Sequence, residues 1–189
     1  MNIRIIPMTE AYIEGVVAAI NEADGGPIAQ TLCGKGERDW DAFRGGLEKS
    51  LKNSDHVNCV AIAGNQVVGH LFVHRDSDAR KRHRAIFGLT IMKDYTGQRL
   101  GTRFMANLLE AAASLRVSVL DSVVLDSNLQ GLDFWLRKGF FIYGKKPDAV
   151  LRSGVLVDLF EIAVQIRRDE FVPPNRRQRF LSFFFRYIF

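Results

Sequence analysis

The chain has 189 residues, of which 47% are hydrophobic and 25% charged, as is ordinary for a globular domain in water. This length suits one domain that can bury a sizeable hydrophobic core. No run reaches the roughly 18 apolar residues of a membrane-spanning helix, and residues 1–10 lack the apolar core of a signal peptide. The chain has two cysteines, and neither a disulfide framework nor a zinc-ligand spacing is indicated, so we expect a cytoplasmic protein.

The formal net charge of +5 is concentrated near the C-terminus. Residues 167–189 contain six arginines against Asp169 and Glu170, which leaves residues 1–166 close to neutral. The sequence predicts a domain of residues 1–166 followed by a basic, aromatic extension of residues 167–189. A nearly neutral domain gives no electrostatic reason to expect a nucleic-acid partner.

The extension carries a cluster of apolar side chains that water solvates poorly. Phe180, Phe184 and Ile188 recur at i, i+4 and i+8, which indicates a short helix with one apolar face. Pro173-Pro174 separates this segment from the domain. We expect it to dock on its own domain or in a homodimer, with peripheral membrane contact through Arg and Phe side chains as the further alternative.

Helical and strand-like patterns alternate along the chain. Apolar residues at helical spacing predict four helices, and short apolar runs predict the strands between them. Gly64-Asn65 is typical of a hairpin turn, and Ser153-Gly154 lies near a second turn. In chain order the predicted elements are strand 3–6, a helix from Thr9 to the Gly25-Gly26-Pro27 break, helix 40–51, strands 56–63, 66–74 and 84–92, helix 100–115, strand 118–126, helix 129–136, and strands 140–143 and 155–164.

The most informative segment connects strand 84–92 to helix 100–115. A short polar turn that contains Gly97 leads directly into the helix, where Gly101 follows. Such a turn exposes several backbone N–H groups at the positive N-terminus of a helix, which is a ready site for a phosphate or pyrophosphate. The sequence therefore predicts the main ligand site at this turn.

The order of elements and the motifs within it resemble the GNAT superfamily of N-acetyltransferases over roughly residues 3–164. The family's Gln/Arg-x-x-Gly-x-Gly/Ala turn corresponds to residues 96–101. Its asparagine, which precedes a short helix with an aromatic residue and a Gly-Phe pair, corresponds to Asn128, Trp135 and Gly139-Phe140. A third likeness, in residues 151–154 and nearby, is to bacterial acetyltransferases that act on free amino acids or protein N-termini.

The resemblance implies an α/β (α+β) fold with a central, mostly antiparallel sheet of about six or seven strands flanked by four helices. It also implies acetyl-CoA as co-substrate, without a metal, and direct acetyl transfer to a primary amine. The acceptor would be a small amino-acid-like metabolite or a protein N-terminus. The residues that the resemblance places at the coenzyme are Leu89, Thr90, Ile91, Thr96, Gly97, Gln98, Arg99, Leu100, Gly101, Thr102, Asn128 and Trp135.

Several positions depart from the family pattern. Thr96 stands where the family has Gln or Arg, and Arg99 replaces a glycine close to the phosphates. Trp135 takes the place of a tyrosine that reprotonates the coenzyme thiolate, which an indole N–H cannot do. Val123 stands where some relatives have a glutamate base. These departures keep open the alternative of a non-catalytic acyl-CoA-binding or interaction protein.

With the usual acid and base positions empty, two catalytic routes remain. One is a water relay from His83, Tyr143 or Asp158. The other is orientation alone, which contributes about 7–11 kcal/mol when a neutral amine is held in line with the thioester. In either case the backbone amide of Ile91 is a candidate to stabilise the developing oxyanion.

The histidines and cysteines are interpreted as structural. His56, His70, His74 and His83 share no metal-ligand spacing, and the buried-strand position of Cys59 predicts an inert core thiol; Cys33 lies in a glycine-rich loop and stays open. No metal site is predicted. A polyamine or aminoglycoside acceptor would require a cluster of carboxylates, which the sequence does not show.

Overall fold

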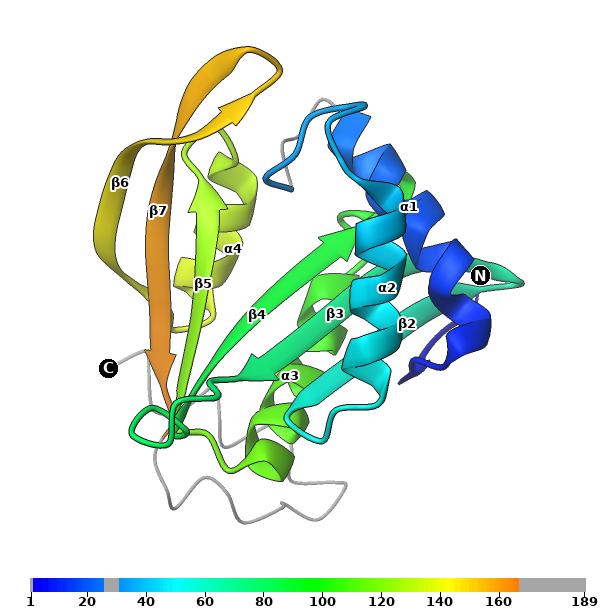
Figure 1. Cartoon of the computed structure of the whole chain (residues 1–189), viewed down its shortest axis with the longest axis horizontal. Helices are drawn as coiled ribbons and strands as arrows, with labels where there is room; N and C mark the ends of the chain where they lie inside the picture. Colours follow the sequence, from blue (N-terminus) through cyan, green and yellow to red (C-terminus); the bar gives the residue numbers. More distant parts are fainter. Residues whose placement is uncertain (1, 26–30, 167–189) are drawn as a thin grey trace.

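A seven-stranded sheet forms the centre of the computed structural model, which describes residues 2–25 and 31–166 (Figure 1). The strand order is β1-β2-β3-β4-β5-β7-β6, and every neighbouring pair is antiparallel except the parallel pair β4 and β5. The strands are β1 (Ile3–Pro7), β2 (His56–Ala63), β3 (Gln66–Arg75), β4 (Arg84–Ile91), β5 (Val119–Leu125), β6 (Phe141–Arg152) and β7 (Val155–Gln165). The helices are α1 (Ile13–Gly25), α2 (Trp40–Leu51), α3 (Leu100–Leu115) and α4 (Leu129–Arg137), with 3-10 turns at Glu10–Tyr12 and Lys93–Tyr95.

The predicted fold class, a mostly antiparallel sheet flanked by four helices, is confirmed. Most boundaries agree within a few residues, and β6 is the exception. We expected this strand to end at Tyr143, whereas it continues to Arg152. Its register shifts between Ile142 and Gly144 and again between Lys146 and Val150, so the alternation that marks a strand is lost there. The predicted extension of residues 167–189 lies outside the described residues.

Helices cover both faces of the sheet, and each face has its own hydrophobic core. Helices α1 and α2 lie on one face, while α3 and α4 lie on the other (Figure 1). The predicted apolar stripe of α3 is buried along its length, at Leu100, Phe104, Leu108 and Leu115. This burial fixes α3 against β2, β3 and β4, and so fixes the turn that precedes it.

Strands β4 and β5 part soon after they meet. Residues 84–86 of β4 pair with residues 119–121 of β5, and the Ser122 Oγ then donates to the Phe87 carbonyl oxygen at 2.9 Å. Beyond this point β4 continues beside β3 while β5 continues beside β7, so the sheet opens between them (Figure 1). The second half of β4 therefore has a strand on one side alone, and this opening positions the site.

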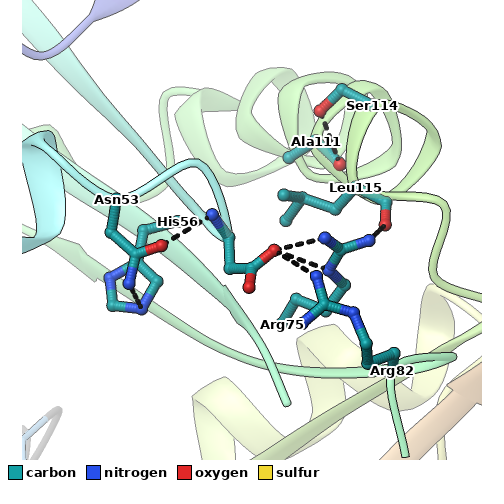
Figure 2. A network of polar contacts seen from close by, with 8 residues as sticks. Asn53, His56, Arg75, Arg82, Ala111, Ser114 and Leu115 are labelled. Carbon is teal, nitrogen blue, oxygen red and sulfur yellow. Dashed lines mark hydrogen bonds and ion pairs between the residues drawn. The ribbon is translucent and has the colours of Figure 1, made fainter. Parts of the chain in front are cut away.

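A polar network holds the end of β3 to the end of α3 (Figure 2). The Asp55 carboxylate accepts hydrogen bonds from Arg75 and from Arg82, the latter at 2.8 Å. Arg75 Nη1 also donates to the Leu115 carbonyl oxygen at 2.8 Å, at the negative C-terminus of α3. The two guanidinium groups lower the pKa of Asp55, with the Arg75 hydrogen bond as the largest cause.

Candidate active site

The N-terminus of α3 has no side-chain cap among the described residues, in contrast to those of α2 and α4. Asp39 caps α2 and Asn128 caps α4, each by accepting a hydrogen bond from a first-turn amide at 2.9 Å. Gly97 and Arg99 before α3 have left-handed backbones, with φ of +72° and +60°. The first-turn amides of a helix have no partner within the helix, so residues 100–102 present N–H groups suited to an anion.

A cavity of about 300 Å³ begins at this turn and runs between α3, α4 and the end of β4. Gly101 allows the two helices to approach closely, since a Cβ there would lie 3.1 Å from the Phe134 ring. The lining residues are Leu89, Ile91, Tyr95, Thr96, Gly97, Arg99, Leu100, Gly101, Thr102, Asn128, Gln130, Gly131, Phe134, Trp135 and Arg137.

Ten of the twelve residues that the resemblance places at the coenzyme line this smaller cavity. Of the other two, Thr90 lines a second cavity, because neighbouring residues of a strand face opposite sides of the sheet. The Gln98 side chain instead donates to the Asp94 carbonyl oxygen at 2.8 Å. Sequence reasoning did not anticipate Phe134 and Arg137, which reach the cavity from α4.

The second cavity, of about 580 Å³, lies on the α1 and α2 side of the sheet, over β3, β4 and β5. It shares Leu89, Asn128 and Trp135 with the smaller cavity. The two cavities therefore meet where β4 and β5 part.

Trp135 forms an aromatic wall at the junction. Its ring is 8% exposed and packs edge-on against Phe87, Phe134 and Phe140, with ring centroids 4.8–5.0 Å away. The indole N–H has no hydrogen-bond partner among the described residues. Trp135 therefore offers contact area and one N–H donor at the junction, but no acidic hydroxyl.

The three residues considered for a water relay line neither cavity. His83 lies before β4, where its carbonyl oxygen accepts from the amides of residues 118 and 119. Tyr143 is half exposed on β6, and Asp158 on β7 forms an ion pair with Lys145 at 2.6 Å. The structure thus brings none of these side chains to the junction.

The larger cavity contains polar side chains that we had interpreted as structural. His70 on β3 is 3% exposed, and Nε2 lies 3.2 Å from Asn58 Oδ1. Burial lowers the pKa of His70 to about 4, with a smaller effect from His74. His74 stacks on His56 at 3.8 Å between ring centroids, and burial lowers its pKa to about 4 as well. Both rings are therefore neutral near pH 7.

Arg38 places a fixed cation in the larger cavity. Its Nε and Nη2 donate to the two carboxylate oxygens of Asp24 at 2.8 and 2.9 Å. The guanidinium also lies over the Phe43 ring, 5.0 Å from its centroid. The Asp24 hydrogen bond is the largest cause of the raised pKa of Arg38. Among the described lining residues Arg38 is the one with a permanent charge, and none is Asp or Glu.

Within residues 2–25 and 31–166, no group of three or more His, Cys, Asp or Glu side chains could hold a metal ion. In the same part of the chain, no helix combines the length and apolar character needed to cross a membrane.

A family model described as the acetyltransferase (GNAT) family matches residues 28–140. The chain belongs to this family. The L-amino acid N-acetyltransferase AaaT of Escherichia coli K12 is 28% identical over 105 residues, which make up 55% of this chain and 65% of that protein. The chain thus matches slightly less than two thirds of that relative's length.

Solved structures share the fold at lower identity. A ribosomal-protein-alanine N-acetyltransferase from Brucella melitensis has a TM-score of 0.75 at 21% identity, covering 86% of this chain and 99% of that one. A phosphinothricin acetyltransferase from Sinorhizobium meliloti, solved in complex with acetyl-CoA, has a TM-score of 0.76 at 11% identity, covering 88% and 89%. At these identities the likeness shows a common fold. The family resemblance expected from the sequence is confirmed.

Proposed function

We propose that this protein transfers an acetyl group from acetyl-CoA directly to the primary amine of a small acceptor that also carries a carboxylate, such as an amino acid. The observation that carries the proposal is the junction of two cavities at Leu89, Asn128 and Trp135. One cavity has the features of a coenzyme groove, and the other has those of an acceptor pocket.

The smaller cavity suits acetyl-CoA, the co-substrate of a relative of this fold. The uncapped amides of residues 100–102 would hold the pyrophosphate, and Arg99 adds a positive charge beside them. The second half of β4, from Leu89 to Ile91, would carry the pantetheine arm toward the junction. There the thioester would lie beside Trp135.

The larger cavity favours an acceptor with a negative group. Arg38 lines it, whereas the Asp24 carboxylate that holds Arg38 is 1% exposed and does not. An acceptor would therefore meet the guanidinium, which binds carboxylates through directed hydrogen bonds. A polyamine would meet this cation without any lining carboxylate among the described residues, which disfavours that class of acceptor.

Transfer at the junction requires no protein nucleophile. The thioester is already activated, and a neutral amine attacks it when the two are held in line, a gain of about 7–11 kcal/mol from orientation. Trp135 cannot reprotonate the thiolate, so this proton would come from water. The competing proposal, a non-catalytic acyl-CoA-binding protein, differs in predicting coenzyme binding without turnover.

Calorimetric titration with acetyl-CoA, followed by a thiol-release assay, tests the proposal. Wild-type protein should bind acetyl-CoA, and Gly101→Glu should abolish binding because it adds bulk against Phe134 and negative charge beside the pyrophosphate. In the assay, free amino acids should react faster than their amides, polyamines or peptides. Failure to bind acetyl-CoA would overturn the proposal, and binding without thiol release from any amine would favour the non-catalytic alternative.

Arg38→Gln tests the acceptor class. Loss of one charged hydrogen bond, about 1.5–3 kcal/mol, should raise KM for amino acids by about 10- to 100-fold and remove their advantage over amides. Arg38→Lys keeps the charge and should retain part of that advantage. Arg44→Gln is the matched control, because Arg44 pairs with Glu14 outside the cavity. A preference for peptides in the wild-type protein would instead indicate a protein N-terminus as acceptor.

A further inference from the structure

The floor of the larger cavity contains a neutral imidazole in a defined orientation. Residues 70, 72 and 74 of β3 lie on one face of the sheet and line the cavity as His70, Phe72 and His74. His70 is the cross-strand partner of Thr90 on β4. Thr90 also lines the cavity and lies between the two β4 residues, Leu89 and Ile91, that line the smaller one. His70 is thus next to the part of β4 proposed to carry the thioester.

A chain of hydrogen bonds determines which ring nitrogen of His70 carries the proton. The Ser50 hydroxyl donates its one hydrogen to the Leu47 carbonyl oxygen at 2.7 Å, so it can only accept from Asn58 Nδ2, 3.0 Å away. This contact turns Asn58 Oδ1 toward His70 Nε2, at 3.2 Å. Because Oδ1 only accepts, Nε2 must donate, and the neutral ring then has its lone pair on Nδ1.

Among the described residues, none donates a hydrogen bond to the lone pair on Nδ1. Nδ1 has no hydrogen-bond partner among the described residues. It is also not one of the fully buried polar side-chain atoms that lack a partner there. Since the ring lines the cavity, Nδ1 is open to a molecule bound there. Among the described residues that line the cavity, no other side chain has one ring nitrogen with an unused lone pair while the other ring nitrogen is held by a hydrogen bond that it donates.

We propose that His70 is a catalytic residue, with Nδ1 accepting a hydrogen bond from the acceptor amine and taking the proton that this nitrogen loses. This inference rests on the proposed function. As the amine nitrogen bonds to the acetyl carbon, the carbon–sulfur bond breaks and the coenzyme leaves as a thiolate. The proton moves from the nitrogen to Nδ1 and from there to water, while the thiolate takes a proton from water, so charge and atoms balance.

The surroundings of His70 keep Nδ1 available. Burial holds the pKa of His70 near 4, so the ring is neutral and able to accept at pH 7. The titratable or charged groups that face the cavity are His74 on β3, Arg38 and Cys33 on the loop before α2, and none from α1, α2, β4 or β5. An imidazole of this kind cannot deprotonate a free ammonium ion efficiently. It suits an amine that enters neutral, whose N–H becomes strongly acidic once the nitrogen bonds to carbon.

The first experiment compares His70→Gln with His56→Gln. General-base catalysis contributes about 100- to 10,000-fold, so His70→Gln should lower kcat by that factor and leave the Kd for acetyl-CoA unchanged. His56→Gln removes an imidazole of β2 that lines neither cavity, and kcat should change no more than a few-fold. Melting curves confirm that both variants fold. Turnover by His70→Gln equal to that of His56→Gln would overturn the inference.

The second experiment shifts the titration of His70. In Asn58→Asp a carboxylate faces the Nε2 hydrogen, which favours the charged ring and raises its pKa. The acid limb of the kcat profile, which reports the ionisation of groups in the complex with bound substrates, should therefore move to higher pH, an effect that a merely structural role of His70 would not produce. An unmoved acid limb in folded Asn58→Asp would contradict the inference.

Nitrogen NMR of protein labelled in its histidines gives a test that needs no variant of Asn58. The His70 signals, assigned by their loss in His70→Gln, should show a protonated Nε2 and an unprotonated Nδ1 near pH 7, with titration near pH 4. A protonated Nδ1 would overturn the inference. If the wild-type protein acetylates no amine, the proposed function fails; if it is active and His70→Gln is equally active, only the role of His70 fails.

Discussion

At the scale of single residues, Arg99 combines a strained backbone with a useful charge. Its φ of +60° is left-handed, a conformation that costs a residue with a Cβ about 1–2 kcal/mol. The family glycine at this position would adopt it without that cost. In exchange, Arg99 brings a guanidinium to the cavity that contains the uncapped N-terminus of α3. Stability and the proposed binding of acetyl-CoA therefore make opposite demands on this residue.

Arg99→Gly should separate the two effects. Removal of the strain should raise the melting temperature by a few degrees, since about 1 kcal/mol corresponds to roughly 2–4 °C in a domain of this size. Loss of the charge should weaken acetyl-CoA binding, most visibly at low salt. Arg116→Gly is the control, because Arg116 has a φ of +55° at the opposite end of α3 and lines neither cavity. It should stabilise the protein without changing the Kd; equal losses of affinity in both variants would show that the charge at residue 99 is not involved.

The site was predictable from sequence where chemistry follows from local spacing. Gly97 and Gly101 mark a turn before an apolar-striped helix, and this local pattern located the smaller cavity. The relay of Ser50, Asn58 and His70 joins three elements, so nothing in the spacing of these residues along the chain indicates it. A histidine within an apolar strand, read alone, is more often structural. The available signal was the alternation of His70, Phe72 and His74, which indicates that one face of this strand is aromatic and polar rather than aliphatic.

At the scale of elements, the tip of the β6–β7 hairpin holds the loop that precedes α2. The Glu37 carboxylate accepts hydrogen bonds from the amide of Gly34, at 2.5 Å, and from the amide of Ser153 at the hairpin turn. Arg152 Nη2 donates to the Asp24 carbonyl oxygen at 3.1 Å. Residues 31–33 and 38 of this loop line the larger cavity. The hairpin thus fixes one wall of the proposed acceptor pocket.

Glu37→Ala should loosen this wall. Loss of the bond to Ser153, about 1.5 kcal/mol for a charged acceptor, should raise KM for the acceptor by about 10-fold and leave the Kd for acetyl-CoA unchanged. Steady-state kinetics with both substrates varied measures the two separately. Glu14→Ala, which removes an exposed carboxylate from α1 outside both cavities, is the control. An unchanged acceptor KM in Glu37→Ala would contradict the assignment of this loop to the pocket.

The elements themselves show why some boundaries were predictable and others were not. The stripe of α3 repeats over four turns in a helix packed on one face, so its period identified it. Strand β6 is mostly exposed, contains Gly144 and Pro147, and changes register twice. Its sequence therefore lacks the apolar run or the alternating pattern from which its full length could be predicted. The hairpin that reaches the loop before α2 depends on that length. The contact was therefore not foreseeable.

At the scale of the whole molecule, the two halves of the sheet are joined over a short distance. Residues 84–86 and 119–121 provide the strand pairs, and the Arg84 guanidinium forms an ion pair with Asp121 at 2.5 Å across the same boundary. The cavities occupy the space where this junction ends. The opening of the sheet and the buried imidazoles beside it are thus parts of one arrangement, in which neutral imidazoles lie next to the proposed reaction centre.

That arrangement makes stability depend on pH. Burial lowers the pKa of His70 and of His74 to about 4, whereas the unfolded chain titrates its histidines near 6.5. Between these values the unfolded chain binds protons that the folded protein does not, so the free energy of unfolding should decrease as the pH falls from about 6.5 to about 4. The loss for a buried imidazole such as His70 is about 2 kcal/mol by pH 5. Carboxylates with a lowered pKa, such as Asp55 and Asp158, lose their contributions below this window.

Urea unfolding at pH 7, 6 and 5 measures this dependence. The wild-type protein should lose stability at each step, and His70→Gln should lose less because one of the buried groups is gone. Leu108→Val is the control: it changes a neutral, fully buried side chain of α3 on the opposite side of the sheet from the two histidines, so it should lower stability equally at every pH and leave the slope unchanged. If the free energy of unfolding falls with pH equally in the wild type and in His70→Gln, His70 has the same pKa in the folded and the unfolded protein. That result would remove the basis for a neutral His70 in the folded protein at low pH.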